Sequence, residues 1–219
     1  GVALAVPPAG QAGVLARTRI VFLFAPLYRP SLRFAGAPRR ELGVPTTFNF
    51  LGPLANPARP VAQAIGCADV RMAPLMAGVI AARGHRGMVF HGGDGLDELT
   101  TTTASRVWVV RDGRVSETSL DPIDLGLARS VPSDLVGGVP EQNAKVVRDL
   151  VAGTRGPVRD IVLLNAAAAA LAFAGADPDA PLAPQLEPKL AGAAQAIDSG
   201  AASALLEAWI AATQAARAA

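Results

Sequence analysis

Cysteine, lysine and aromatic residues are scarce in this chain of 219 residues. It has one cysteine, Cys67, two lysines against eighteen arginines, and 5% aromatic residues. A single cysteine excludes an internal disulfide, and no metal-ligating partner lies near it in the sequence. We therefore interpret Cys67 as a small buried apolar residue. The preference for arginine over lysine is typical of a GC-rich coding sequence and carries no functional signal.

Charge is also scarce, and it is nearly balanced. Charged residues make up 17% of the chain and the formal net charge is +2, while 51% of the residues are hydrophobic. This composition excludes an intrinsically disordered tail, which needs few apolar residues and a large net charge. The isoelectric point of about 9.2 reflects only a small surplus of cations. We therefore expect no nucleic-acid partner.

Long hydrophobic runs are absent. The longest apolar stretch, Ala166–Ala176, is mostly alanine and glycine, whereas a membrane-spanning helix needs about 20 apolar residues. We expect no membrane partner. Residues Gly1–Gly10 lack the positively charged segment of a secretory signal, so the expected location is the cytoplasm. Because the chain opens on Gly1 without an initiator methionine, we expect it to start inside a longer gene product.

The pattern of apolar residues predicts an α/β sheet. Three short apolar runs are typical of buried strands: Ile20–Phe24, Val61–Ile65 and Met88–Phe90. Between the last two, apolar residues recur every three or four positions over Met72–Ile80, which predicts a helix with Asp69 as N-cap and Gly84 as its stop. A strand, a helix and a strand in this order predict a parallel pair.

The rest of the chain predicts a hairpin followed by helices. Val107–Val110 and Val115–Thr118 flank an Asp-Gly pair that is typical of a hairpin turn, so the sheet is expected to be mixed. Helices are predicted over 141–151, 158–174 and 201–216. The proline-rich stretch 177–188 is predicted to be a solvent-exposed connector between helices.

An acidic, glycine-rich segment from His91 to Glu98 follows the strand at Met88–Phe90. Ligands of α/β proteins bind beyond the carboxyl ends of strands, and glycines let the backbone approach them. Adjacent Asp97 and Glu98 offer oxygen ligands for a hard cation such as Mg²⁺. The alternative is a polar turn in which one of these carboxylates caps the following element. The next residues, Thr100–Thr103, are predicted to form an extended, hydroxyl-lined strand.

A second segment combines arginines with rigid turns. A helix predicted over Ser31–Leu42 would bring together four arginines: Arg29, Arg33, Arg39 and Arg40. Arginine binds a planar carboxylate with two parallel hydrogen bonds. The prolines and glycines of residues 52–57 fix turns near Asn49, whose amide can tie loops together. The alternative is that one or two of these arginines are ordinary surface charges.

Together the two segments resemble anthranilate phosphoribosyltransferase. The resemblance is carried by these motifs, in chain order: Phe24-Ala25-Pro26, Arg39-Arg40, Gly43-Val44-Pro45-Thr46, Phe48-Asn49, Leu51-Gly52-Pro53-Leu54, Asn56-Pro57, His91-Gly92, Asp94-Gly95-Leu96-Asp97-Glu98, Gly156-Pro157-Val158-Arg159-Asp160 and Leu164-Asn165-Ala166-Ala167. It extends over essentially the whole chain.

The resemblance implies the second step of tryptophan biosynthesis, in which anthranilate and phosphoribosyl pyrophosphate give phosphoribosyl-anthranilate and pyrophosphate with the help of Mg²⁺. By position, Arg39 would bind the anthranilate carboxylate, and Pro26 and Gly52 would line the channel of the aromatic substrate. Asp97 and Glu98 would bind the Mg²⁺ ion that bridges to the pyrophosphate. No side chain is implied as a covalent nucleophile, because the substrate amine supplies the lone pair.

Two departures from the family pattern qualify this expectation. Arg29 stands before Pro30 where the family usually has histidine, which puts a permanent cation beside the expected substrate channel. Arg29 is therefore expected to bind substrate, either as a second cation for the anthranilate carboxylate or as a contact for a different acidic acceptor. The family's Gly-Thr-Gly-Gly-Asp, Asn-x-Ser-x-x-Thr and Lys-His-Gly-Asn-Arg motifs do not occur. The chain therefore corresponds to the C-terminal two thirds of such an enzyme, and alone we expect it to be inactive. The alternatives are transfer to another aromatic acid and a non-catalytic binding relative.

The resemblance also implies an architecture, a nucleoside phosphorylase/phosphoribosyltransferase-like α/β fold. It has a large domain, whose central mixed, mostly parallel sheet is flanked by helices, and a smaller α-helical domain. Residues 1–219 are expected to form the C-terminal portion of the enzyme, mainly its large domain. Segment 31–43 is expected to pack with the small helical domain, and the full-length protein is expected to be a homodimer.

Overall fold

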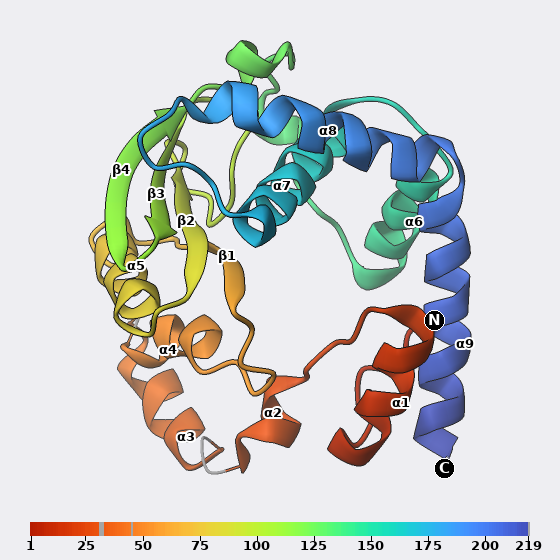
Figure 1. The fold of residues 1–219 in the computed structure, drawn as a ribbon. Helices are drawn as coiled ribbons and strands as arrows, with labels where there is room; N and C mark the ends of the chain where they lie inside the picture. The colour runs from red at the N-terminus through yellow and green to blue at the C-terminus, as the bar shows by residue number, and fades with distance from the viewer. Residues whose placement is uncertain (31–32, 45, 219) are drawn as a thin grey trace. The chain divides into compact units, whose positions relative to one another are not determined.

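The chain forms two compact units (Figure 1). In the computed structural model, which describes residues 1–30, 33–44 and 46–218, one unit comprises Gly1–Ala58 with Gly200–Ala219 and the other comprises Arg59–Ser199. The first unit is helical, and the second contains the sheet and most of the buried core.

The sheet of the second unit has four strands in the order β1-β2-β3-β4: β1 (Ala62–Gly66), β2 (Arg86–Gly92), β3 (Ser105–Arg111) and β4 (Arg114–Leu120). β1 pairs with β2 in parallel, while β2 with β3 and β3 with β4 are antiparallel. The predicted mixed sheet is confirmed. Its predicted mostly parallel character is wrong for these strands, because only the β1–β2 connection carries a crossover helix.

The second unit has helices on both faces of this sheet (Figure 1). Met88 and Phe90 of β2 join a buried cluster with residues of α7 (Pro157–Ala174) and α8 (Leu182–Asp198). Side chains alternate along a strand, so the buried Val89 faces the other way, where α5 (Ala73–Ala82) packs on β2 and β3. β2 and β3 are thus buried on both sides, which explains their continuous apolar runs.

The predicted hairpin and crossover helix are both present, with one correction. Asp112 and Gly113 have φ of 51° and 75°, the left-handed pair that a two-residue hairpin turn needs. α5 forms as predicted and Gly84, with φ of 69°, follows it. Asp69 is not its N-cap, because the Asp69 carboxylate instead accepts hydrogen bonds from the backbone and guanidinium of Arg71.

The C-terminal helices of this unit differ from prediction at one place. α6 (Pro140–Val151) and α7 match the predicted helices, and two short 3₁₀ turns at Pro122–Leu125 and Pro132–Asp134 precede them. The predicted connector over 177–188 is wrong beyond its first residues, because α8 begins at Leu182 and buries Leu182 and Leu186. Apolar contacts with α7 stabilise this helix although it contains Pro188.

By length and composition, α7 is apolar enough to cross a membrane, with a mean hydropathy of 1.5 over its 18 residues. Leu164, Ala168 and Leu171 of this helix are buried against the sheet and α8. Such burial is typical of the core helix of a folded domain, and a core helix can have the same length and apolar composition as a membrane-spanning one.

The first unit comprises α1 (Pro8–Thr18), α2 (Ala25–Tyr28), α3 (Arg33–Leu42), α4 (Phe48–Leu54) and α9 (Ala201–Ala218). α1 packs on α9 through Val14 and Ala212. α3 confirms most of the helix predicted over 31–42, whose first two residues, Ser31 and Leu32, lie outside the described residues.

The strand predicted at Ile20–Phe24 does not form, since the four described strands all lie in the second unit. Its backbone carbonyl groups find other partners: Ile20 O accepts from the hydroxyl of Thr18, and Phe22 O accepts from the amide of Gln11. A short apolar run without a neighbouring strand is thus held by the side chains of α1.

Candidate active site

The acidic loop, residues 93–104, joins antiparallel β2 to β3 at the carboxyl end of β2. Its backbone passes close to the end of β1. A β-carbon added to Gly66 would lie 1.5 Å from the carbonyl oxygen of Asp97, so only glycine fits there. Asp97 and Glu98 are therefore brought to the carboxyl ends of the parallel pair, as the sequence predicted for a ligand-binding loop.

Asp94 organises the first part of the acidic loop. Its carboxylate accepts hydrogen bonds from the hydroxyls of Thr100 and Thr102, at 2.7 and 2.5 Å, and from the backbone N–H of Leu96 at 3.2 Å. Burial alone would raise the pKa of Asp94, but the hydrogen bonds donated by the two threonines and by backbone N–H groups lower it. Asp94 thus has a structural role in holding the loop.

The same contacts correct two predictions about this segment. Thr100–Thr103 do not form a strand, because the hydroxyls of Thr100 and Thr102 point back to Asp94 and hold the chain in an irregular turn. Neither Asp97 nor Glu98 caps a helix, since the acidic loop leads directly into β3. The capping role in that alternative is therefore wrong, while the segment is a polar turn held by Asp94.

Two further contacts anchor the middle of the acidic loop and the strand that precedes it. The side-chain amide of Asn165, on α7, bonds both backbone groups of Leu99: Leu99 N donates to Oδ1 at 3.0 Å and Nδ2 donates to Leu99 O at 2.8 Å. Before the loop, Nδ1 of His91 lies 2.8 Å from the carbonyl oxygen of Cys67. Cys67 is buried, as predicted, and its burial raises the pKa of the thiol.

Asp97 and Glu98 carry the free negative charge of the acidic loop. In the part of the chain that the structure describes, neither carboxylate has a hydrogen-bond donor or an ion-pair partner. Burial, and then repulsion from Asp97 and Asp94, raises the pKa of Glu98. A raised pKa means that the ionised carboxylate lacks compensation, and a bound cation would supply it.

Asp97 and Glu98 fit a Mg²⁺ ion that takes its remaining ligands from a substrate and from water. Residues 1–30, 33–44 and 46–218 contain no group of three or more His, Cys, Asp or Glu arranged to hold a metal ion. Protein sites for Mg²⁺ commonly supply only one or two carboxylates and leave the other positions to phosphates and water. The adjacent, unpartnered Asp97 and Glu98 match that donor set.

Arg39 lies in an open cavity of the first unit, of about 510 Å³, lined by Gly36, Arg39, Arg40, Gly43, Val44 and Asn49. Its guanidinium donates to Oδ1 of Asn49 at 3.1 Å and lies 5.4 Å from the ring centre of Phe48. Oδ1 of Asn49 also accepts from the backbone N–H of Thr46 at 3.0 Å. Asn49 thus ties α3 to the segment before α4, and it leaves other Arg39 N–H groups for a ligand. The turn predicted at Gly52-Pro53 is wrong, because both residues lie inside α4.

The remaining predicted site residues of this unit have different environments. The guanidinium of Arg29 donates to the carbonyl oxygens of Gly52, at 2.9 Å, and of Ala55 at the end of α4. Arg29 and Gly52 are therefore brought together, and Arg29 satisfies backbone groups of α4. Pro26 is exposed in the first turn of α2. The side chain of Arg33 lies outside the described residues.

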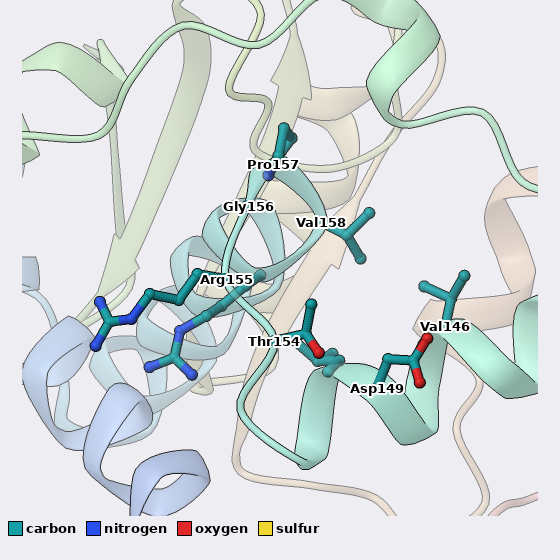
Figure 2. Close-up of a pocket in the computed structure, with 9 residues that line it drawn as sticks. Val146, Asp149, Thr154, Arg155, Gly156, Pro157 and Val158 are labelled. Atoms are coloured by element: carbon teal, nitrogen blue, oxygen red, sulfur yellow. The ribbon is translucent and has the colours of Figure 1, made fainter.

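A smaller cavity of about 210 Å³ lies between α6 and the start of α7 (Figure 2). It is lined mainly by apolar side chains such as Val146, Leu150 and Val158. Figure 2 shows Arg155 extending away from Asp149 and Thr154. None of the site residues predicted from the sequence lines this cavity. The candidate functional residues remain those of the acidic loop in the second unit and those of the Arg39 cavity in the first unit.

Sequence reasoning missed two residues that shape the acidic loop, Gly66 and Asn165. Asn165 is a polar residue inside the otherwise apolar run from Ile161 to Ala174, and such a residue must find a buried partner. Gly66 follows directly on an apolar strand, where a glycine indicates close backbone approach. Both signals are present in the sequence, but neither identifies its partner.

Known proteins match this chain over nearly all of its length. A family model described as "Glycosyl transferase family, a/b domain" matches residues 1–203. The chain is 55% identical over 215 residues to anthranilate phosphoribosyltransferase of Thermobifida fusca, and 54% identical over 215 residues to that of Nocardioides sp.. These matches cover 98% and 97% of this chain but only 61% and 62% of the relatives.

Solved structures agree with the sequence comparison. The crystal structure of anthranilate phosphoribosyltransferase from Thermus thermophilus superposes with a TM-score of 0.86 at 36% identity, covering 98% of this chain and 62% of the other. The Saccharomyces cerevisiae enzyme in complex with PRPP and Mg has a TM-score of 0.85 at 24% identity, covering 96% of this chain and 59% of the other. That likeness concerns the fold alone. The resemblance and the predicted α/β fold with a mixed sheet flanked by helices are confirmed, and the chain belongs to the glycosyl transferase family whose a/b domain it matches.

Proposed function

We propose that this chain is part of an anthranilate phosphoribosyltransferase, the enzyme of the second step of tryptophan biosynthesis. The observation that carries the proposal is the 55% identity over 215 residues to the Thermobifida fusca enzyme. The chain spans only about three fifths of the length of that relative. We therefore propose that catalysis requires residues that the relatives carry outside the matched region, and that the complete protein acts in the cytoplasm as a homodimer.

The reaction joins the amine nitrogen of anthranilate to the anomeric carbon of phosphoribosyl pyrophosphate. The bond from that carbon to the pyrophosphate oxygen breaks, pyrophosphate leaves with the bonding electron pair, and the amine loses one proton to solvent. Because the amine already has a lone pair, no side chain needs to act as a covalent nucleophile. The protein's task is to hold amine and sugar in line and to offset the charge of the leaving group.

The residues of the first unit would bind the acceptor. Arg39, held by Asn49 and Phe48, would bind the anthranilate carboxylate with two parallel hydrogen bonds. Pro26 and Gly52 would line the path of the aromatic ring. Arg29 would support this wall indirectly, since its guanidinium bonds the carbonyl oxygens of Gly52 and Ala55.

The residues of the second unit would serve the leaving group. Asp97 and Glu98 would hold a Mg²⁺ ion, which when bound supplies positive charge to the departing pyrophosphate. Asp94 and its two threonine donors would keep these carboxylates presented at the carboxyl ends of β1 and β2. The raised pKa of Glu98 supports this assignment, because it indicates uncompensated negative charge.

The proposal is tested with the complete gene product, anthranilate, phosphoribosyl pyrophosphate and Mg²⁺. We expect Mg²⁺-dependent loss of anthranilate and release of pyrophosphate, abolished by a chelator. Arg39→Ala should raise the KM for anthranilate about 30-fold with a smaller change in kcat, because a charged hydrogen-bonded contact is worth roughly 2 kcal/mol. Arg39→Lys keeps the charge without the planar fork, so its KM for anthranilate should lie between the values of the unmodified protein and of Arg39→Ala.

Two outcomes would favour the alternatives. Faster turnover of another aromatic acid, with anthranilate turnover restored by Arg29→His, would indicate a different acceptor. The bonds from Arg29 to Gly52 and Ala55 argue against this, since they orient that guanidinium toward the backbone. The complete protein would instead be a non-catalytic relative if it lacked transfer activity and if Asp97→Ala left its other measurable properties unchanged.

A further inference from the structure

We propose that Asn165, on α7, is a positioning residue that holds the acidic loop in the form that binds a divalent cation. The inference rests on the proposed metal role of Asp97 and Glu98. It assigns a function to a side chain that lies on another element, 66 positions along the chain from the residue that it contacts.

The hydrogen bonds of Asn165 leave its amide little freedom. Oδ1 accepts from Leu99 N at 3.0 Å, and Nδ2 donates to Leu99 O at 2.8 Å and to Ile161 O at 2.9 Å. Both hydrogens of the amide nitrogen are therefore committed. Leu99 itself is 1% exposed, so its backbone groups have no water to replace these partners.

Gly66 limits the acidic loop on the other side. With a carbonyl oxygen of Asp97 only 1.5 Å from the place of a β-carbon, the backbone of Asp97 rests against the end of β1. Leu99, two residues later, is fixed to α7. Glu98 lies between these two supports, so the direction of both carboxylates depends on them.

An amide suits this position better than the alternatives of similar size. Leucine would leave the buried N–H and C=O of Leu99 without partners. Aspartate would keep an acceptor for Leu99 N but lose the donor to Leu99 O, and it would add a further negative charge beside the acidic loop. Asparagine satisfies both backbone groups without adding charge.

The test measures Mn²⁺ binding to the complete gene product by the electron paramagnetic resonance signal of the free ion. Asn165→Ala, which introduces a residue common in this helix, and Asn165→Leu, which keeps the volume, should each weaken Mn²⁺ binding about tenfold. Loss of a residue that orients a metal ligand typically costs that much or more. Hydrogen exchange of peptides covering 93–104 should rise in both variants.

Gln185 offers a matched control on α8. Its amide also bonds both backbone groups of one residue, with Asp177 N donating to Oε1 at 2.8 Å and Nε2 donating to Asp177 O at 3.1 Å. Gln185→Ala and Gln185→Leu should raise exchange around Asp177 but leave Mn²⁺ affinity unchanged. An equal loss of affinity in these variants would overturn the inference, because it would show a general effect of stability.

Unchanged Mn²⁺ affinity in the Asn165 variants, or no Mn²⁺ binding by the unmodified protein, would also overturn the inference. Its failure is distinguishable from failure of the proposed function. A protein that transfers phosphoribosyl groups but binds Mn²⁺ equally well without Asn165 retains the function and refutes the positioning role. A protein that binds Mn²⁺ in an Asn165-dependent way without transfer activity retains the positioning role.

Discussion

Different kinds of contact stabilise the Arg39 cavity and the acidic loop. Around Arg39 the contacts are short in sequence: Arg39 and Asn49 are 10 positions apart, and Thr46 and Asn49 are 3 apart. The acidic loop has local contacts between Asp94 and Thr100 and Thr102, but it is also held by Asn165, which is 66 positions from Leu99, and by the close approach of Gly66 to Asp97. Local contacts can be recognised in a motif, whereas distant ones depend on the packing of β1, β2 and α7.

Burial differs in the same direction. The residues lining the Arg39 cavity are half-buried or exposed, while Leu99 and Thr100 beside the acidic carboxylates are almost fully buried. Exposed polar contacts each contribute little to stability, since water competes for them. Substitutions that disturb the acidic loop should therefore lower the free energy of unfolding more than substitutions around Arg39. Gly66→Ala, Asp94→Asn and Asn49→Ala measure the difference.

The largest effect is expected for Gly66→Ala. The added β-carbon would overlap the carbonyl group of Asp97, so the acidic loop must move or the strand must shift. We expect a loss of about 3 kcal/mol in the free energy of unfolding, at the upper end for overpacking. Urea denaturation measures the loss, and Mn²⁺ titration should show weaker binding as well.

Gly78→Ala is its control. Gly78 lies on the exposed side of α5, where an added β-carbon meets nothing within 4 Å. Alanine is favoured over glycine inside a helix by about 0.5–1 kcal/mol, so this variant should be slightly more stable than the parent. If Gly66→Ala were equally harmless, the claim that distant packing fixes the acidic loop would be wrong.

Asp94→Asn should have an intermediate effect. The variant loses the charge that accepts hydrogen bonds from Thr100 and Thr102, and we expect a cost of about 1.5 kcal/mol at pH 7. The lowered pKa of Asp94 in the folded state means that its stabilisation is present above the unfolded pKa and is lost as the pH falls through the folded value.

The difference between parent and variant should accordingly be constant near neutrality and shrink below about pH 4. Thermal unfolding followed from pH 3 to pH 8 measures it. A difference that stays constant down to pH 3 would mean that the ionised carboxylate does not hold the acidic loop.

The smallest effect is expected for Asn49→Ala. Its amide oxygen accepts from Arg39 and Thr46 at an exposed site, so stability should fall by only about 0.5 kcal/mol. Because Arg39 would lose its orientation, the KM for anthranilate should rise several-fold while kcat changes less. A loss of stability as large as that of Gly66→Ala would contradict the contrast between the two regions.

Much of the fold could be predicted from local pattern. The strands at 61–65 and 88–90, the Asp-Gly hairpin and the helices at 141–151 and 158–174 were recognisable because their apolar spacing matches their secondary structure. Ile20–Phe24 misled because a short apolar run does not reveal whether a partner strand exists. The helix from Leu182 was hidden by its prolines, which its packing on α7 outweighs.

By itself the sequence determined the family and the residue types at the candidate site. Motifs of contiguous residues, such as those containing Arg39 and Asp97-Glu98, are written in the order of the chain and need no fold to be recognised. Only the tertiary structure decided that Gly66 lies against Asp97, that Arg29 bonds the backbone of α4, and that Asn165 reaches Leu99. These contacts depend on which elements pack together, and no local spacing encodes that.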